Sequence, residues 1–472
     1  MASEKKFQIL IIGGSISGLS LAIMLEKVGI DYLLLEAHPT IAPQLGASIG
    51  LEPNGLKILD QLGCYDSLRE IAGDVYYRCS IRSSDGLTLS ETQGASASER
   101  IESLTGYPST FIDRQMLLQV LYEQICKKEC VLTGKRVSEV QMDDSGVTVK
   151  TCDGSTYSGD ILIGADGVRS FIRQEMWRLA SQEKHNMFPP NEAQSLNSNT
   201  KCIFGISKHP KGWRGVQHAA FNDGRSYLLI PAPKDRVYWF FIKMMDRTYY
   251  GNDIPRFSKE DEAALASQYL DDSISDTIKF RDVYEERQIT TLVALEEHVF
   301  SRWNYQRILL IGDSAHKLHP ITAQGGNGAI ETAATFINTL VATLNSTSGA
   351  LSAEEIETML ARVQAKRQNV ITEVMRQGRL MNSLFCQQLP FSKLMIRTIV
   401  PWQGDSLFVR AWYKSYLKGT HIESLELPRR LVTGSSYGLL VPQSLLHSWM
   451  MWTTGAVCSG LAAFIFVQFR KA

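Results

Sequence analysis

The sequence has no surplus of charge of either sign. Its 49 lysine and arginine residues balance 49 aspartate and glutamate residues, so no overall field attracts nucleic acid, and we expect no nucleic-acid partner. Its composition, with 44% hydrophobic and 21% charged residues, is that of a folded globular protein. With 472 residues, the chain is too long for one small core and indicates two or three interlocked domains.

The sequence lacks the spacings of cysteine and histidine that are typical of metal sites. Eight cysteines are scattered without the paired spacing of a zinc site, and His316 and His319 have no acid or cysteine spaced to join them. We therefore expect no metal site, and we interpret the cysteines as buried free thiols in a reducing compartment. A cleavable signal is absent too, since Glu4, Lys5 and Lys6 lead directly into an apolar strand.

What the sequence does contain is a strand, a tight turn, a helix and a second strand between Phe7 and Glu36. The four parts are Ile9 to Ile12, Gly13-Gly14-Ser15-Ile16-Ser17-Gly18, Leu19 to Val28 and Tyr32 to Leu35. This order is typical of the nucleotide-binding half of a Rossmann unit.

Each residue type in this unit has a physical role toward a dinucleotide. Gly13 allows the turn, Gly18 allows the helix to pack closely on the strand, and the helix start offers free N–H groups to a diphosphate. Ser15 replaces the middle glycine of the fingerprint, which leaves the backbone less room to approach the ligand. Glu36 lies where an acid takes the ribose hydroxyls of an adenosine, and its charge favours FAD or NAD over NADP.

Two later stretches have features that suit the same ligand. Gly46-Ala47-Ser48-Ile49-Gly50 lets a backbone run against a flat ligand, although a plain strand bend explains it equally well. Asp113 is expected to cap a helix that runs to about Cys126. Arg114 at that helix start opposes the helix dipole, so either an anion offsets it or the side chain is solvated.

Further along, two buried strands end in acids. The strand from Gly159 delivers Asp166-Gly167 at its carboxyl end, where open α/β sheets bind ligands. The strand from Arg307 ends in Asp313, which can accept hydrogen bonds from a polyol. The stretch Gln324 to Glu331, which includes Gly326 and Asn327, then opens a helix and forms a second anion-friendly helix start.

A different pattern fills the region between these strands. Four long strands are predicted at Cys202 to Ile206, His218 to Phe221, Ser226 to Ile230 and Val237 to Ile242. They predict a mostly antiparallel sheet with one face available to wall off a substrate. Its many aromatic side chains are better explained as core than as ligand contacts.

The C-terminal part combines helices with one long uncharged run. Ala353 to Asn382 is predicted as an amphipathic helix, and Gly434 to Gly438 as a linker. Trp449 to Val467 has no charged residue, has tryptophans at one end and is followed by Arg470-Lys471. Its helical length of roughly 28 Å suits a membrane-spanning anchor that contacts lipid, with a buried terminal helix as the alternative. The expected location is a membrane, with the catalytic domain in the cytosol.

Together these features predict an α/β fold with a Rossmann-like dinucleotide-binding domain, a mostly antiparallel β-sheet substrate domain and a C-terminal helical region ending in a transmembrane helix. The family resemblance given next implies that the first of these is an FAD-binding domain. The expected boundaries are 1–180 and 301–350 for the two parts of the FAD-binding domain, 181–300 for the β-sheet domain, 351–436 for the helical region, and 437–472 for the linker and anchor.

With these motifs in order, the chain resembles the flavoprotein monooxygenases of the para-hydroxybenzoate hydroxylase type. The motifs are Gly13 to Gly18, Gly164 to Ser170 and Gly312 to Pro320. Three segments of the chain are also similar to those of the fungal FAD-dependent epoxidases of indole-diterpene and meroterpenoid pathways, in which the fingerprint serine is usual. The similar segments are Gly-Gly-Ser-Ile-Ser-Gly, Gly-Ala-Ser-Ile-Gly and Phe-Ile-Asp-Arg-Gln.

The resemblance implies roles for single residues. Glu36 would bind the adenosine ribose, Gly50 and Arg114 would line FAD, Asp313 would hold the ribityl chain, and Gly326 would lie near the isoalloxazine, at a helix start shared with Asn327. Relatives often have a tyrosine at the position of Asn222, and here Tyr227 is the only local substitute, so it is the candidate catalytic tyrosine. Asp166 and Gly167 would help position NADPH, for which no second fingerprint exists.

The activity implied is an NADPH-consuming, FAD-dependent epoxidation of an alkene in a prenylated substrate, with a terpene cyclase as a further, downstream partner. Two other activities stay open: an aromatic hydroxylase of a phenol on the same fold, and a membrane-anchored flavin-binding protein without turnover. A flavin halogenase is disfavoured, because no tryptophan forms the Trp-x-Trp-x-Ile-Pro pattern.

Overall fold

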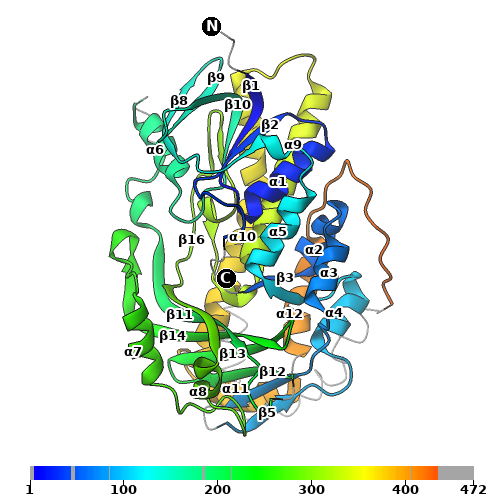
Figure 1. Ribbon diagram of the computed structural model, residues 1–472, viewed down its shortest axis with the longest axis vertical. Helices are drawn as coiled ribbons and strands as arrows, with labels where there is room; N and C mark the ends of the chain where they lie inside the picture. Colours follow the sequence, from blue (N-terminus) through cyan, green and yellow to red (C-terminus); the bar gives the residue numbers. More distant parts are fainter. Residues whose placement is uncertain are drawn as a thin grey trace, which may run out of the picture.

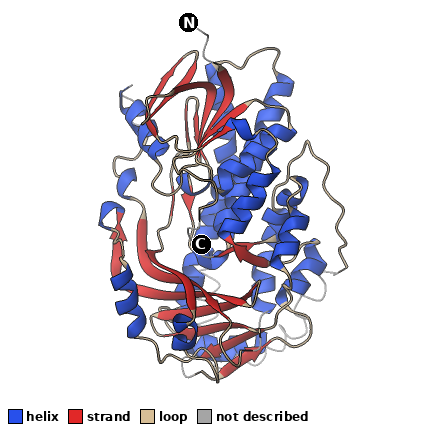
Figure 2. Cartoon of the chain, in the orientation of Figure 1, coloured by secondary structure: helices blue, strands red, loops and turns tan. Residues whose placement is uncertain are grey.

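The computed structural model describes residues 5–43, 48–83, 86–182, 187–213, 215–403 and 406–433. Two large sheets lie at opposite ends of the view in Figure 1, and long helices run between and beside them. Figure 2 shows the same arrangement with the sheets in red and the helices in blue. The α/β class that the sequence predicts is therefore present.

The first sheet has eight strands, and its central order is β17-β18-β10-β1-β2-β7. β1 lies between β10 and β2 and is parallel to both, as a Rossmann unit requires. The last four residues of β1, Ile9 to Ile12, are buried, because helices cover both faces of a parallel sheet. The strands are β1 (Lys6–Ile12), β2 (Tyr32–Leu35), β7 (Val131–Leu132), β8 (Val137–Asp143), β9 (Gly146–Thr151), β10 (Thr156–Gly164), β17 (Asn304–Tyr305) and β18 (Ile308–Leu310).

Helix α1 is the best buried of the helices that accompany this sheet. Its residues from Ile16 to Leu25 are all buried, since it packs against both α5 and α9. The accompanying helices are α1 (Ile16–Lys27), α5 (Arg114–Gln124), α6 (Phe171–Gln182) and α9 (Gln324–Ser346). α1 follows directly from the carboxyl end of β1, so the predicted strand, turn and helix are confirmed.

The second sheet has seven strands in the order β15-β11-β14-β13-β12-β4-β5. It is antiparallel apart from β4 and β12, which pair in parallel. The strands are β4 (Cys79–Ser83), β5 (Thr88–Glu91), β11 (Asn197–Lys208), β12 (Gln217–Asn222), β13 (Arg225–Ala232), β14 (Arg236–Tyr250) and β15 (Arg287–Ala294). The predicted strands between 202 and 242 all occur, and β4 and β5 join them from the range 1–180.

The two faces of this sheet pack against different parts of the chain. Tyr227 and Phe241 belong to a core beneath α7 (Lys259–Ser267) and α8 (Phe280–Glu285). Residues of the opposite parity, such as Phe240 and Ile230, belong to a separate cluster that includes Phe111. Strand alternation therefore decides which aromatic side chains can face the first sheet.

Shorter elements connect the two sheets. The strand pair β3 (Ser48–Leu51) and β6 (Thr110–Asp113) lies between them, as does the short pair β16 (His298–Val299) and β19 (His316–Lys317). The helices α2 (Pro53–Gln61), α3 (Tyr65–Ala72) and α4 (Ala97–Thr105) follow β3 or precede β6. Because β6 leads directly into α5, residues 113 and 114 stand at the junction of the two sheets.

The C-terminal helices are α10 (Ala353–Phe385), α11 (Ser392–Gln403) and α12 (Ser406–Lys418). A capping box starts α10, in which Ser352 accepts from the Glu355 N–H and Glu355 accepts from the Ser352 N–H. α10 packs against α9, and α12 packs against α4 and α2. The helical region therefore covers both the first sheet and the space between the sheets.

The transmembrane part of the predicted fold class has to be corrected. In the ranges that the structure describes, no helix combines the length and apolar character needed to cross a bilayer. Trp449 to Val467, for which the span was predicted, lies outside these ranges, as do the predicted linker and the range 437–472. The fold is thus described without a membrane anchor, and the membrane location predicted from it is withdrawn.

The predicted cap at α5 also needs correction. Asp113 is the N-cap residue, but its side chain makes no capping hydrogen bond. Its carboxylate instead accepts two hydrogen bonds from Arg236, at 2.9 and 3.0 Å, and a third from the Tyr238 hydroxyl. A fixed arginine and tyrosine compete successfully with the free N–H groups of the helix start, because hydrogen bonds between charged partners are the stronger ones.

Candidate active site

A cavity of about 720 Å³ lies at the carboxyl ends of β1, β2 and β10. We call it the glycine-lined cavity. It collects residues from many separate parts of the sequence, and those that the sequence analysis selected are Gly13, Ser15, Glu36, Gly50, Arg114, Asp166, Gly167, Asp313 and Gly326. Gly18, Asn327 and Tyr227 do not line it.

The turn between β1 and α1 is built from backbone. Gly13 has φ +112°, and a Cβ there would lie 2.4 Å from the Ala165 carbonyl oxygen, so only glycine fits. At Gly18, a Cβ would lie 1.9 Å from the Gly13 carbonyl oxygen. This close approach of α1 to the turn is the packing for which Gly18 was selected.

Ser15 has a partner that the sequence did not reveal. Its side chain does not cap α1 but accepts a hydrogen bond of 2.6 Å from Nη2 of Arg114. Burial lowers the pKa of Arg114, while the nearby carboxylates of Asp313 and Glu36 oppose that shift. The sequence analysis predicted an anion near Arg114, and the carboxylates of Asp313 and Glu36 supply part of that negative charge.

Glu36 is anchored at the end of β2 by two backbone groups. Its Oε2 accepts from the Gly14 N–H and its Oε1 from the His38 N–H, both at 2.6 Å. These bonds fix the carboxylate at the edge of the cavity. Each carboxylate oxygen has a second lone pair, so both remain able to accept from ligand hydroxyls.

Asp166 and Asp313 end two neighbouring strands of the first sheet. Asp166 accepts from the Ile172 N–H at 3.0 Å near the start of α6, and burial raises its pKa. Asp313 forms an ion pair of 2.5 Å with Lys317, four residues later in β19. Lys317 also lines the cavity, and the sequence analysis did not select it.

The start of α9 approaches the cavity from the other side. Gly325 and Gly326 line the cavity, and a Cβ on Gly325 would meet no atom within 4 Å. Asn327 is fully buried and donates to the carbonyl oxygens of Gly50, at 3.0 Å, and Ala323, at 2.6 Å. Asn327 therefore ties β3 to α9 rather than facing a ligand.

These features fit FAD. Neither helix start at this cavity has an acid in its first turn, and neither N-cap side chain, Ser15 or Ala323, caps its helix. Both starts thus keep free N–H groups and a partial positive charge for an anion. A dinucleotide with a diphosphate at the α1 start and a flavin ring near the α9 start would interact with both helix starts, with Glu36 beside the ribose.

Tyr227 does not line the glycine-lined cavity, although it is among the residues that line an adjoining cavity. Its ring stacks on Phe241 with 4.8 Å between centroids, and its hydroxyl donates to Asp272 at 2.6 Å. Both contacts lie in the core beneath α7 and α8. Asn222, at the position where relatives often have a tyrosine, is buried on β12. The structure thus gives Tyr227 a place in the core and does not bring its hydroxyl to the glycine-lined cavity.

The two histidines considered for a metal are buried beside threonine hydroxyls. Nε2 of His316 lies 3.1 Å from the Thr332 hydroxyl, and Nε2 of His319 lies 3.3 Å from the Thr200 hydroxyl. Burial lowers the pKa of each histidine to about 3. Across the described ranges, no group of three histidine, cysteine or acidic residues could hold a metal ion.

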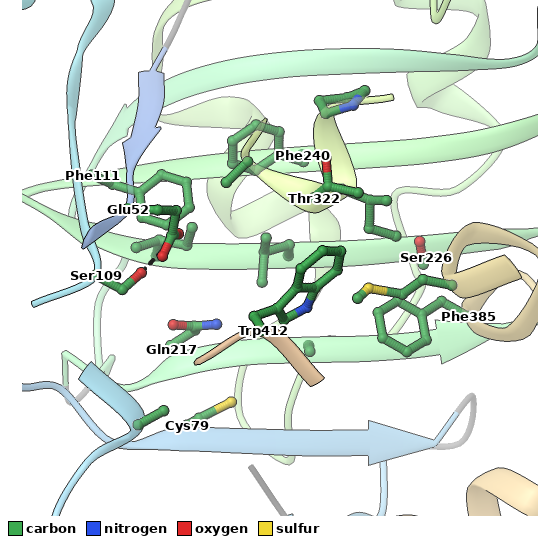
Figure 3. Close-up of a pocket in the computed structure, with 18 of the residues that line it drawn as sticks. Glu52, Cys79, Ser109, Phe111, Gln217, Ser226, Phe240, Thr322, Phe385 and Trp412 are labelled. Carbon is green, nitrogen blue, oxygen red and sulfur yellow. Dashed lines mark hydrogen bonds between the residues drawn. The ribbon is translucent and has the colours of Figure 1, made fainter. Parts of the chain in front are cut away.

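A second cavity, of about 210 Å³, adjoins the first. We call it the aromatic cavity. It shares Phe111, Phe240, Pro320 and Ala323 with the glycine-lined cavity, so the two meet at that wall. Figure 3 shows its apolar lining, which includes Trp412 from α12 and Phe385 from α10. The sequence analysis did not select Phe111, Phe240 or Glu52, all of which line it.

Comparison with known proteins agrees with these features. The family model for an FAD binding domain matches residues 6–377. The FAD-dependent monooxygenase spyC of Aspergillus fumigatus is 38% identical over 438 residues, which cover 92% of this chain and 91% of spyC. The FAD-dependent monooxygenase cle3 of Aspergillus versicolor is 35% identical over 474 residues, which cover 100% of this chain and 94% of cle3.

Solved structures show the same fold. The Klebsiella pneumoniae HpxO structure complexed with FAD and uric acid has a TM-score of 0.69 at 23% identity, over 87% of this chain and 97% of HpxO. The p-nitrophenol 4-monooxygenase PnpA from Pseudomonas putida has a TM-score of 0.68 at 16% identity, over 89% of this chain and 100% of PnpA.

The family model spans most of the chain, and relatives share more than a third of its residues over nearly their full length. The resemblance drawn from the motifs is thereby confirmed, and FAD is the cofactor of the family. This chain belongs to the fungal FAD-dependent monooxygenases.

Proposed function

We propose that this monooxygenase uses NADPH to reduce FAD and epoxidises an alkene in the prenyl chain of a small-molecule substrate. The observation that carries the proposal is the aromatic cavity, which meets the glycine-lined cavity at Phe111, Phe240, Pro320 and Ala323. A prenyl chain is apolar, and burying it among aromatic and aliphatic side chains is favourable at roughly 25 cal/mol per Å².

The lining of the aromatic cavity suits such a chain better than a small charged ring. One side of the lining comes from the face of β13 and β14 that points toward the first sheet, and its residues are Leu228, Ile230, Phe240 and Ile242. Met381, Phe385 and Trp412 close the opposite side from α10 and α12. Basic side chains do not occur among the described residues that line it, so a carboxylate-bearing substrate would find no partner there.

In this proposal, the residues of the glycine-lined cavity hold FAD. The α1 start and Arg114 bind the diphosphate, Glu36 the adenosine ribose, Asp313 the ribityl chain, and the α9 start the flavin ring. Bound FAD would supply the redox chemistry that activates oxygen. The protein would orient the ring toward the aromatic wall and exclude water from it.

Asp166 and Gly167 are proposed to help position NADPH. Both line the glycine-lined cavity, and Gly167, at φ +85°, leaves open space where a side chain would otherwise stand. Because the sequence contains one dinucleotide fingerprint, the nicotinamide would reach the flavin without a domain of its own. An epoxide product would be a strained electrophile, so we propose a terpene cyclase as the class of enzyme that consumes it.

The test uses the FAD-loaded protein with NADPH, oxygen and 2-farnesylphenol as a probe, and product analysis by mass spectrometry. We expect NADPH consumption that depends on the probe, together with an epoxide or the diol derived from it. The matched control is the same phenol with a saturated chain, which should give no product.

Each rival activity predicts a different result. An aromatic hydroxylase would add a ring hydroxyl to both phenols, and that outcome would overturn the epoxidase proposal. A flavin-binding protein without turnover would consume no more NADPH with the probe than without it.

A further inference from the structure

One acid lines the aromatic cavity. Glu52 stands between β3 and α2, and it is the only residue with a formal charge among the described residues of that lining. It is 5% exposed, so its carboxyl lies away from bulk water. Figure 3 shows Glu52 and Ser109 together at one side of the cavity, opposite Ser226 and Phe385.

The two carboxyl oxygens of Glu52 differ in their partners. Oε1 accepts a hydrogen bond of 2.9 Å from the Ser109 hydroxyl. Oε2 is buried and accepts no hydrogen bond of normal geometry within the part of the chain that is described, although the Tyr416 hydroxyl lies near enough to the carboxyl to lower its pKa. Buried polar atoms in native proteins nearly always have a partner, so an oxygen held open beside a cavity points to a ligand donor.

Helix α2 does not use the carboxyl. Glu52 is the N-cap residue of α2, yet its side chain makes no capping hydrogen bond. Its main chain stabilises the start of α2. The N–H donates to Asn327 at 3.1 Å, and the carbonyl accepts from the Gly55 N–H at 2.9 Å. The side chain is thus free of the helix and turned to the cavity.

The surroundings of the carboxyl are uncharged. Burial raises its pKa to about 7, and the hydroxyl groups of Ser109 and Tyr416 oppose the shift. Tyr77 also lies close enough for Glu52 to raise its pKa. Among the described residues of this lining, the other polar groups are uncharged, so the carboxyl of Glu52 is the strongest hydrogen-bond acceptor that the cavity offers.

We propose that Oε2 of Glu52 accepts a hydrogen bond from a hydroxyl group of the substrate, so that Glu52 selects substrates that combine an apolar chain with a hydroxyl or phenol. Glu52 is thereby a specificity-determining residue that orients the chain in the aromatic cavity. The inference rests on the proposed function for the nature of the chain, whereas the donor follows from the carboxyl alone.

The test compares the affinities of two probes for the oxidised, FAD-loaded protein. The probes are 2-farnesylphenol and its methyl ether, which differ in one donor, and binding is followed by the change in flavin absorbance or fluorescence. Wild type should bind the phenol about tenfold or more tightly than the ether. Glu52→Leu should remove this preference, and Glu52→Gln should reduce it while leaving a part, since an amide oxygen still accepts.

The matched control is Gln217→Leu, which removes another polar side chain of the same lining. It should change the two affinities alike and keep their ratio, because the carboxyl is intact. A ratio that stays at the wild-type value in Glu52→Leu, or a wild type that does not distinguish the probes, would overturn the proposal. If Glu52→Leu does not fold, the nearly isosteric Glu52→Gln decides by the same ratio.

This measurement needs no turnover. A protein that prefers the phenol through Glu52 but forms no epoxide would refute the proposed function and leave the inference on Glu52 standing. A protein that forms the epoxide with equal affinity for both probes would do the reverse.

Discussion

Nη2 of Arg114 donates a hydrogen bond of 2.6 Å to Oγ of Ser15, which links the start of α5 to the start of α1 across 99 residues of sequence. The serine that replaces a fingerprint glycine therefore holds the Arg114 guanidinium in place. The guanidinium is held at the helix start where a diphosphate would bind, and this arrangement leads to the first prediction.

Arg114→Ala should lose FAD more than Arg114→Lys, and lysine should not restore full binding. A charged, forked donor contributes roughly 1.5 to 3 kcal/mol, or about ten- to a hundredfold in FAD affinity, and a lysine replaces the fork with a point charge. The measurement is the ratio of flavin to protein absorbance after purification, followed by titration with FAD. Equal flavin retention in wild type and both variants would mean that Arg114 takes no part in binding.

Glu36→Ala and Asp313→Ala should each weaken FAD binding by about five- to a hundredfold, because each removes an acceptor from buried hydroxyl donors, at roughly 1 to 3 kcal/mol. Glu36→Ala should have the larger effect on folding as well, since Glu36 also holds the Gly14 and His38 N–H groups. Glu70→Ala, at an exposed position of α3, serves as the control. Full flavin occupancy in both test variants would contradict the assignment.

Gly325→Ala and Gly18→Ala should separate cofactor binding from folding. A Cβ on Gly325 enters open space beside the cavity, so the protein without FAD should keep its stability or gain up to about 1 kcal/mol, while FAD affinity falls. A Cβ on Gly18 would lie 1.9 Å from the Gly13 carbonyl oxygen, so that variant should unfold at clearly lower urea concentration. Unchanged FAD affinity in Gly325→Ala would show that nothing binds beside that helix start.

The stability of the protein should depend on pH through Glu52. Its folded-state pKa of about 7 lies above the ordinary value of 4.5, so the folded chain binds more protons than the unfolded chain between these values. The free energy of unfolding therefore falls as pH rises through this window, and the cost is complete above about pH 8. Glu52→Gln should be more stable than wild type by up to about 3 kcal/mol at pH 8 and by almost nothing at pH 4.5.

Urea unfolding at both pH values, with FAD in excess, measures this difference. The groups that face the carboxyl, Ser109, Tyr77 and Tyr416, stay uncharged over the whole window, so they do not mask it. A difference between the two proteins that is the same at pH 4.5 and pH 8 would mean that Glu52 does not titrate in this range.

Local patterns predicted much of the fold and of the candidate site. The strand, turn and helix from Lys6 to Lys27 follow from a short apolar run and two glycines, and both the structure and the family comparison contain them. Glu36 and Asp313 could be selected because an acid at the carboxyl end of a buried strand has few structural uses. Both line the glycine-lined cavity.

Contacts between distant segments were the part that local patterns could not predict. β4 joins the second sheet by pairing in parallel with β12, far along the chain, and neither strand specifies its partner. Tyr227 was selected by its nearness in sequence to Asn222, and the pattern did not reveal that strand alternation packs its ring against Phe280 of α8. Glu52 was overlooked because an acid before a proline at a helix start is ordinary until its burial is known.

Asp113 and Arg114 are consecutive residues with opposite attachments. Asp113 is bound by Arg236 and Tyr238 of the second sheet, and Arg114 reaches back to the turn of the first. The peptide bond between them thus sets the spacing between the glycine-rich turn of the first sheet and β14 of the second. In evolutionary terms, a substitution at one of these positions would break one attachment, whereas an inserted or deleted residue between them would break both at once, so the length of this junction should be less free to change than its composition.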